Sequence, residues 1–257
     1  MIEEIIIKGN ESGKYPFSIP LFANGFSMLL KSPVTILVGE NGTGKSTFMK
    51  AVQSKFGLYA INDDVYGEKR KDASFVDYRP KTTKPKGFFF ESLTFINYIE
   101  SLNKEKELAR AELERVQKEY ANASEYARTM ASTPFARTLH EINGMYEKDL
   151  SQSSHGESYL DFFSSRLREG QFYLLDEPET PLSTQNQLTL VALILEGVRN
   201  GCQFLIATHS PIVAAVPDAT IYEILDQELV EVDYDDISGI RMMKQFLNHK
   251  EQFLRHL

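Results

Sequence analysis

Short apolar runs alternate with polar, glycine-rich stretches in the N-terminal part of the chain, and they predict a strand-rich start. Residues 2–10 are rich in isoleucine and alternate weakly, which is typical of a strand, and a second strand is expected at 26–30. The run "VTILV" at 34–38 has the length and hydrophobicity of a buried strand. A glycine-rich loop follows it, and a helix is expected from Ser46 onward.

The C-terminal part repeats the order strand, helix, strand. Apolar runs lead to Asp176 and to Thr208, and the sequence between them, at 185–201, has the pattern of a helix. Residues 219–234 have the pattern of a hairpin. This order predicts an α/β fold with a mainly parallel central sheet and an antiparallel β part.

The segment 62–87 is polar and rich in proline and lysine, which predicts a long loop. Its basic side chains form a cluster: Lys69, Arg70, Lys71, Arg79, Lys81, Lys84 and Lys86. Such a cluster is either a solvated loop or a contact surface for nucleic acid, so nucleic acid is a possible partner.

Residues 93–131 contain neither glycine nor proline, and apolar residues recur in steps of four and three. The seam consists of Ala109, Leu113, Val116, Tyr120, Ala123, Ala127 and Met130. This spacing predicts a helix of roughly 30 residues, about 45 Å long at ~1.5 Å per residue. The helix either packs on its own domain or forms a projecting arm or a partner-binding hairpin.

Composition narrows the class of protein and its compartment. The chain has 257 residues, of which 42% are hydrophobic and 25% charged, as in an ordinary globular protein. No apolar run approaches the ~20 residues that span a bilayer, and acids stand where an export signal has bases. Cys202 is the only cysteine, so we expect a cytoplasmic protein without membrane insertion. The net charge of −8 argues against a chain coated in nucleic acid.

A phosphate-binding loop is the clearest chemical signal. The stretch from Gly39 to Ser46 fits G-x-x-x-x-G-K-[ST], with a strand before it and a helix after it. Glycines let backbone N–H groups surround a phosphate, and the helix N-terminus adds positive charge. Lys45 is expected to neutralise the β- and γ-phosphates, and the Ser46 hydroxyl to bind Mg²⁺. The expected nucleotide-binding residues are Gly39, Glu40, Asn41, Gly42, Thr43, Gly44, Lys45, Ser46 and Thr47.

Two further polar groups follow apolar strands, at the sheet edge where open α/β folds bind ligands. Asp176 suits the Mg²⁺ shell, and Glu177 is placed to orient a water molecule and accept its proton. His209, at the end of the later strand, is expected to sense the γ-phosphate. Lys45, Glu177 and His209 are therefore the expected catalytic residues.

These stretches in this order resemble the ABC-type ATPase heads. "GENGTGKST", "LLDEPE", "TPLS" and "ATHS" match the Walker A, Walker B, D-loop and H-loop sequences. The chain is most similar to stand-alone AAA-family predicted ATPases of bacteria and their mobile elements, which are related to RecF-type and structural-maintenance-of-chromosomes heads. The resemblance covers nearly the whole chain and is weakest over residues 58–135.

The resemblance gives "SSHGES" a place upstream of Walker B, where the family has a signature loop close to L-S-G-G-Q. Ser154 matches the signature serine, Gly156 the second glycine and Glu157 the glutamine, whereas His155 replaces the first glycine. In the family this loop closes on the γ-phosphate held by a second subunit, which implies an ATP-dependent homodimer. The same residues also fit an ordinary capping box, with Ser154 and Glu157 three residues apart.

The sequence departs from the family in the Q-loop, because no glutamine lies between Gln53 and Gln117. Glu91 is the candidate substitute as a metal ligand. Tyr15 or Phe17 either stacks on the adenine base or belongs to the core.

The resemblance implies a single ABC-type ATPase domain over 1–257. Residues 1–57 and 151–257 would form the nucleotide-binding lobe, and about 93–150 a helical insertion or signature subdomain. It also implies ATP and Mg²⁺ as cofactors. We expect an ATP-dependent dimerisation switch that controls an effector protein. A DNA-associated repair-type ATPase, a transporter subunit and, less in keeping with Glu177, a small-molecule kinase are the alternatives.

Overall fold

The computed structural model describes residues 1–60, 73–80, 84–144 and 155–255. They form two compact units. Unit 1 comprises Met1–Ser92 and Arg166–Leu257, and unit 2 comprises Leu93–Ser165. The division falls at Ser92 and Arg166, so the helix that follows "SSHG" groups with unit 2 rather than with the nucleotide-binding lobe.

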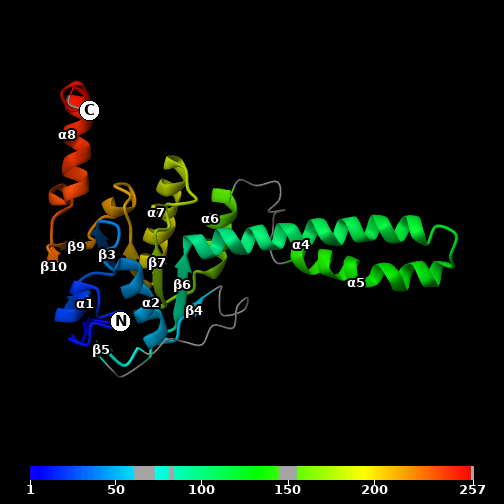
Figure 1. Ribbon diagram of the computed structural model, residues 1–257, viewed down its shortest axis with the longest axis horizontal. Coiled ribbons are helices and arrows are strands. Elements are labelled where there is room, and N and C mark those ends of the chain that lie inside the picture. The colour runs from blue at the N-terminus through cyan, green and yellow to red at the C-terminus, as the bar shows by residue number, and fades with distance from the viewer. Residues whose placement is uncertain (61–72, 81–83, 145–154, 256–257) are drawn as a thin grey trace. The chain divides into compact units, whose positions relative to one another are not determined.

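The main sheet of unit 1 has seven strands in the order β10-β9-β3-β8-β7-β6-β4 (Figure 1). Only β10 runs antiparallel to its neighbour. The strands are β3 (Val34–Gly39), β4 (Tyr59–Ala60), β6 (Gly87–Glu91), β7 (Phe172–Asp176), β8 (Gln203–Ala207), β9 (Thr220–Leu225) and β10 (Glu228–Glu231). The expected α/β fold with a mainly parallel sheet is therefore confirmed.

Burial explains why the central strands are apolar throughout. Every residue of β7 and β8 is buried, because parallel strands at the centre of such a sheet are covered on both faces. Helix α2 (Lys45–Phe56) packs on β3, β7 and β8, and α7 (Thr184–Arg199) packs on β8. Gly197 permits the close approach of α7, because a Cβ there would lie 2.6 Å from the Phe204 ring.

A second, antiparallel sheet has the order β2-β1-β5, with β1 (Glu4–Ile7), β2 (Phe26–Leu29) and β5 (Val76–Arg79). The prediction of one long loop at 62–87 is therefore wrong at β5. Val76 is fully buried, and the Tyr78 ring meets Phe56 at 4.9 Å, so core contacts from other segments fix this strand. In the basic cluster, Arg79 pairs with Glu4 at 3.6 Å. Lys69, Arg70, Lys71 and Lys81 lie outside the described residues.

Four short or peripheral elements complete unit 1: α1 (Pro20–Asn24), η1 (Val213–Ala215), η2 (Tyr234–Asp236) and α8 (Ser238–Leu254). The predicted hairpin is β9–β10, and its two turn residues, Asp226 and Gln227, have φ of 47° and 70°. Positive φ at both positions is the geometry of a two-residue hairpin turn. Helix α8 was not predicted from the sequence.

Unit 2 consists of α4 (Ser92–Glu119), whose first residue belongs to unit 1, α5 (Glu125–Gly144) and α6 (His155–Arg166). Figure 1 shows α4 and α5 running side by side in opposite directions. The predicted helix of roughly 30 residues is α4, which has 28. The predicted seam does not continue along one helix, because the helix ends at Glu119 and the next begins at Glu125. The Arg128 side chain donates to the carbonyls of Tyr120 and Ala121, at 3.4 and 3.0 Å, so a residue of the second helix satisfies the end of the first.

Aromatic rings join the start of α4 to α6. At the start of unit 2, Phe95 packs on Tyr159 and Phe162 of α6, with ring centroids 5.0 and 5.3 Å apart. Ala109 and Val116 of the predicted seam are buried, whereas Met130 is exposed. Among the described helices, none has the length and hydropathy needed to cross a membrane.

Candidate functional site

The phosphate loop joins β3 to α2, and its lysine is fixed in place. Lys45 is only 5% exposed, and its Nζ donates to the carbonyls of Gly39 and Glu40 at 2.7 and 3.0 Å. Burial lowers the pKa of Lys45, while the nearby carboxylates of Glu177 and Asp176 oppose this shift. The ammonium group is thus held inside the loop and near acidic groups, where the lysine of a phosphate loop normally lies.

Two glycines of this loop have positive φ but different surroundings. Gly44 has φ of 105°, and a Cβ there would lie 3.1 Å from the Phe22 ring and 3.2 Å from Ile19 Cγ2. Gly42 has φ of 82°, and a Cβ there would meet nothing within 4 Å. Side chains of unit 1 therefore crowd Gly44, whereas Gly42 borders open space.

We expect Gly44→Ala and Gly42→Ala to separate stability from nucleotide binding. Gly44→Ala should lower the free energy of unfolding by roughly 1–3 kcal/mol, because a strained backbone and a close contact add together. Gly42→Ala should cost roughly 1 kcal/mol of strain, yet weaken nucleotide binding, because its methyl group occupies the space left for a phosphate. Urea unfolding and titration with a fluorescent ATP analogue measure the two effects. Equal losses of stability would contradict this assignment.

The strand ends bring the other candidate residues to one edge of the sheet. In the register, Glu91 of β6 lies opposite Asp176 of β7, and Asp176 lies opposite Ala207 of β8. Ala207 also lies opposite Leu37, two residues before Gly39. The phosphate loop, both carboxylates and the turn after β8 therefore share the carboxyl edge of the sheet, as the sequence predicted.

Asp176 is a buried carboxylate with one free oxygen. Asp176 is only 4% exposed, and its Oδ1 has no hydrogen-bond partner among the described residues. Burial raises the pKa of Asp176 to about 6; a hydrogen bond with Ser46 opposes this, and the charges of Glu91 and Glu177 add to it. A buried, unsatisfied carboxylate oxygen beside a serine hydroxyl is a donor set that fits Mg²⁺, which prefers oxygen ligands.

Glu91 lies beside Asp176 but is paired with a cation. Its Oε1 is 2.6 Å from Lys50 Nζ on α2. Burial lowers the pKa of Lys50, but the hydrogen bond and charge of Glu91 outweigh it, so the pKa is raised. Sequence reasoning missed Lys50, since nothing in the local sequence links it to a residue on β6.

Glu177 has an unusual backbone conformation that two hydrogen bonds hold. Its φ is +49°, a left-handed conformation that costs a non-glycine residue roughly 1–2 kcal/mol. Its N–H donates to the Ala207 carbonyl at 2.8 Å, and its own carbonyl accepts the buried Ser92 hydroxyl at 2.6 Å. Strained backbone conformations of this kind are often found at catalytic positions. Ser92 had no signal in the sequence.

His209 lies next to Glu177, and Glu179 fixes its backbone. His209 Nε2 is 3.7 Å from Glu177 Oε1, and the two side chains are 40% and 39% exposed. The N–H groups of His209 and Ser210 donate to Glu179 Oε1 at 2.6 and 3.1 Å. Glu179 thus holds the turn that carries His209, a role that sequence reasoning missed.

The base-stacking candidates have different surroundings. The Tyr15 hydroxyl lies 3.2 Å from Thr47 Oγ1, and Tyr15 is 61% exposed. Phe17 packs edge-to-face on Phe75, with ring centroids 5.3 Å apart. Tyr15 therefore borders the phosphate loop, whereas Phe17 is packed against the core.

The described signature candidates belong to unit 2. Gly156 and Glu157 are in the first turn of α6; Gly156 is buried and Glu157 is exposed. Ser154 lies outside the described residues. The predicted role of these residues toward a second subunit stays a prediction.

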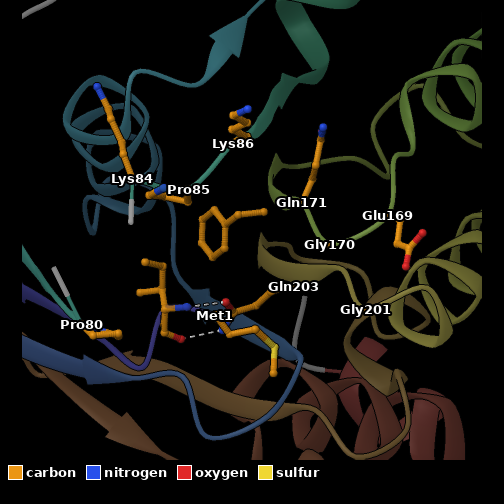
Figure 2. A pocket seen from close by; sticks show the side chains of 12 residues that line it. Met1, Pro80, Lys84, Pro85, Lys86, Glu169, Gly170, Gln171, Gly201 and Gln203 are labelled. Atoms are coloured by element: carbon orange, nitrogen blue, oxygen red, sulfur yellow. Dashed lines mark hydrogen bonds between the residues drawn. The ribbon is translucent and has the colours of Figure 1, made fainter. Parts of the chain in front are cut away.

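A cavity of about 320 Å³ lies at the opposite, amino ends of β6, β7 and β8 (Figure 2). Gln203 crosses it at the base, accepting from the Ile2 N–H at 2.9 Å and donating to the Ile2 carbonyl at 2.8 Å. Lys84 and Lys86 of the basic cluster line it. This cavity is separate from the phosphate loop, because the two occupy opposite edges of one sheet.

Comparisons with known proteins agree with this geometry. The chain is 26% identical over 199 residues to the macrolide export ATP-binding/permease protein MacB of Hahella chejuensis. It is 25% identical over 206 residues to an uncharacterized ABC transporter ATP-binding protein, YvrO, of Bacillus subtilis. These matches cover 76% and 79% of the chain, but 28% and 84% of the relatives. The chain thus spans less than a third of the length of MacB. No family model matches.

Solved structures with the same fold are ATP-binding cassettes and chromosome-maintenance heads. A nucleotide-free ATP-binding cassette of an ABC transporter aligns with a TM-score of 0.51 and 15% identity, over 98% of this chain and 97% of the other. An Smc head bound to the C-terminal winged-helix domain of ScpA aligns with a TM-score of 0.50 and 16% identity, over 90% and 98%. The chain therefore has the fold of ABC-type ATPase heads and is similar in sequence to an ABC transporter ATP-binding protein. ATP with Mg²⁺ is the nucleotide and metal of this class.

Proposed function

We propose that this protein is an ATP-dependent dimerisation switch that hydrolyses ATP and controls a partner protein. The observation that carries the proposal is the convergence of Lys45, Asp176, Glu177 and His209 on the carboxyl edge of one sheet. A bound nucleotide would then meet a cation, a metal-binding carboxylate and a proton acceptor at one place. This is the set of groups that phosphoryl transfer to water requires.

Each residue has a distinct task in this proposal. Asp176 and Ser46 hold Mg²⁺, which supplies charge neutralisation at the phosphate oxygens. Lys45 binds the β- and γ-phosphates, and Glu177 orients the attacking water and accepts its proton. His209 contacts the γ-phosphate, with its backbone fixed by Glu179. Glu91 is a further candidate metal ligand, but Lys50 must release it first.

The exposure of these groups and the signature residues support the proposed dimer. Glu177 and His209 remain well exposed, so the described residues do not enclose the reacting groups. We propose that Ser154, Gly156 and Glu157 of a second copy close over the γ-phosphate. Both copies then contact the same phosphate, and its removal by hydrolysis weakens the dimer.

Light scattering of Glu177→Gln, with and without ATP–Mg²⁺, tests the switch. ATP should shift the protein from its 29.3 kDa monomer to about twice that mass, because the trapped nucleotide keeps both contacts. The double variant Lys45→Ala/Glu177→Gln is the control and should stay monomeric, because it lacks the phosphate-binding ammonium. A monomer with ATP demonstrably bound would contradict the proposal.

A transporter subunit is the second candidate function, because one relative above is named as an ABC transporter ATP-binding protein and the other as a macrolide export ATP-binding/permease protein. Both functions place the protein in the cytoplasm, with a partner protein. Copurification with a membrane protein would favour the transporter. Salt-dependent binding to DNA would instead favour a repair-type ATPase. In the basic cluster of this chain, Arg79 is already paired with Glu4.

A further inference from the structure

Helix α8 carries an uncovered apolar side. Its exposed apolar residues range from 38% to 70% exposure: Met242, Met243, Phe246, Leu247, Phe253 and Leu254. Only Ile240 of this helix is buried. Apolar surface gathered on one side of a helix is costly in water and is typical of an interaction surface.

The first two turns of α8 are held to the rest of unit 1 by hydrogen bonds at Ser238 and by an ion pair between Lys244 and Asp235. The Ser238 N–H donates to both carboxylate oxygens of buried Glu223, at 3.1 and 3.2 Å. Figure 1 shows the helix leaving the rest of unit 1 from this end. Its backbone bends at His249, where φ is −135°, and the Phe246 and Phe253 rings meet at 5.8 Å across the bend. The apolar side is therefore preorganised rather than loosely exposed.

The apolar side begins at the nucleotide edge of the sheet. A hollow of about 260 Å³ is lined by Gly39, Glu40 and His209 of that edge and by Met242 and Met243 of α8. A partner that covers the edge can therefore extend onto α8 without a break.

Charge favours a second copy of this chain as that partner. Helix α8 contains Arg241, Lys244 and Lys250 against the single acid Glu251. The whole chain has 36 acidic and 28 basic residues, so the chain outside α8 has an excess of acidic residues. Just before α8 lie three exposed acids, Asp233, Asp235 and Asp236. Lys244 already pairs with Asp235 of its own chain. A two-fold contact can therefore pair the remaining Arg241 and Lys250 of each copy with Asp233 and Asp236 of the other.

We propose that α8 is a second contact of the ATP-dependent dimer, with its apolar side packed on unit 1 of the other copy. This inference rests on the dimer proposed above. Direct pairing of the two α8 helices is disfavoured, because both are basic.

Two matched double variants in the Glu177→Gln background test the proposal. Met243→Glu/Leu247→Glu places two acids on the apolar side, one helical turn apart. Gln245→Glu/Gln252→Glu introduces the same charge change on the opposite side of the helix. Sedimentation with ATP–Mg²⁺ should give a dimer dissociation constant at least tenfold higher for the first pair and within twofold of the parent for the second. Binding of a fluorescent ATP analogue to the monomer is measured for both pairs, so that the dimer dissociation constants are compared at equal nucleotide occupancy.

The failures of the two proposals differ. A Glu177→Gln parent that stays monomeric with bound ATP overturns the switch and the α8 contact together. A parent that dimerises, with equal dissociation constants for both pairs, overturns the α8 contact alone. Binding to phosphatidylglycerol vesicles that only Met243→Glu/Leu247→Glu abolishes, with dimerisation unchanged, overturns it in favour of a membrane surface.

Cysteine labelling gives an independent readout in the same background. Leu247→Cys should react with a maleimide in the monomer and become at least fivefold less reactive with ATP, whereas Gln245→Cys should not change. The native Cys202 is buried and contributes little background. Equal reactivity of Leu247→Cys with and without ATP overturns the contact.

Discussion

Replacing Glu177 with glutamine is expected to lower the rate of ATP hydrolysis by about 10²–10⁴-fold, the usual contribution of a positioned general base. The amide keeps the shape of the side chain but cannot accept the proton of the attacking water. Nucleotide affinity should be retained, because Lys45 and the loop backbone are untouched. Phosphate release measured at saturating ATP gives the rate, and Glu196→Gln, on an exposed position of α7, is the matched control.

Two features make the Glu177 result diagnostic. The left-handed backbone at Glu177 strains glutamine as much as glutamate, so the melting temperature should not change. A loss of rate then reflects chemistry rather than unfolding. A variant that keeps more than a tenth of the parent rate would show that another group accepts the proton.

Replacing Asp176 with asparagine is expected to have two large effects of opposite sign. Mg²⁺-dependent strengthening of nucleotide binding should be lost, because an amide oxygen is a weaker ligand than a carboxylate. The nucleotide-free protein should nevertheless become more stable at pH 7.5, by roughly 1–3 kcal/mol, since an unpaired buried charge is removed. Thermal melts without Mg²⁺ and nucleotide should show a gain of several degrees.

The pH dependence of that gain has a definite sign. The pKa of Asp176 is about 6 in the folded protein and 3.8 ordinarily, so the folded state binds the proton more tightly. The stability that the group contributes is therefore complete below pH 3.8 and is lost as the pH rises through about 6. The difference between Asp176→Asn and the parent should narrow at pH 5, whereas Asp236→Asn, at an exposed position, should show no gain at pH 7.5. Equal melting temperatures of Asp176→Asn and the parent at pH 7.5 would contradict the assignment of a destabilising charge.

The sequence predicts the part of the site that local patterns determine. The phosphate loop between strand and helix, and the polar residues after two apolar strands, follow from spacing and from the rule that parallel strands end at one edge. Asp176, Glu177 and His209 meet there for that reason. The parallel sheet and the β9–β10 hairpin were predictable in the same way.

Contacts between distant segments were not predictable from these patterns. Strand β5 forms because Val76 is buried and β1 supplies its hydrogen bonds, although its surroundings in the sequence are those of a loop. The break after α4 has no glycine or proline and depends on Arg128 of the next helix. The partners Ser92–Glu177 and Glu179–His209 are 85 and 30 residues apart, beyond the reach of any local pattern.

The pairing of β3 also has a consequence for synthesis on the ribosome. Ile36 of this strand lies opposite Ile206 of β8 and Ile221 of β9, so both neighbours are made well over a hundred residues after it. Until they emerge, the apolar strand that leads into the phosphate loop has no hydrogen-bonded neighbour strand on either side and is prone to aggregation. Closing so long a loop also slows folding. A nascent chain should therefore depend on chaperones until about residue 225 has emerged, and acquire nucleotide binding only after that.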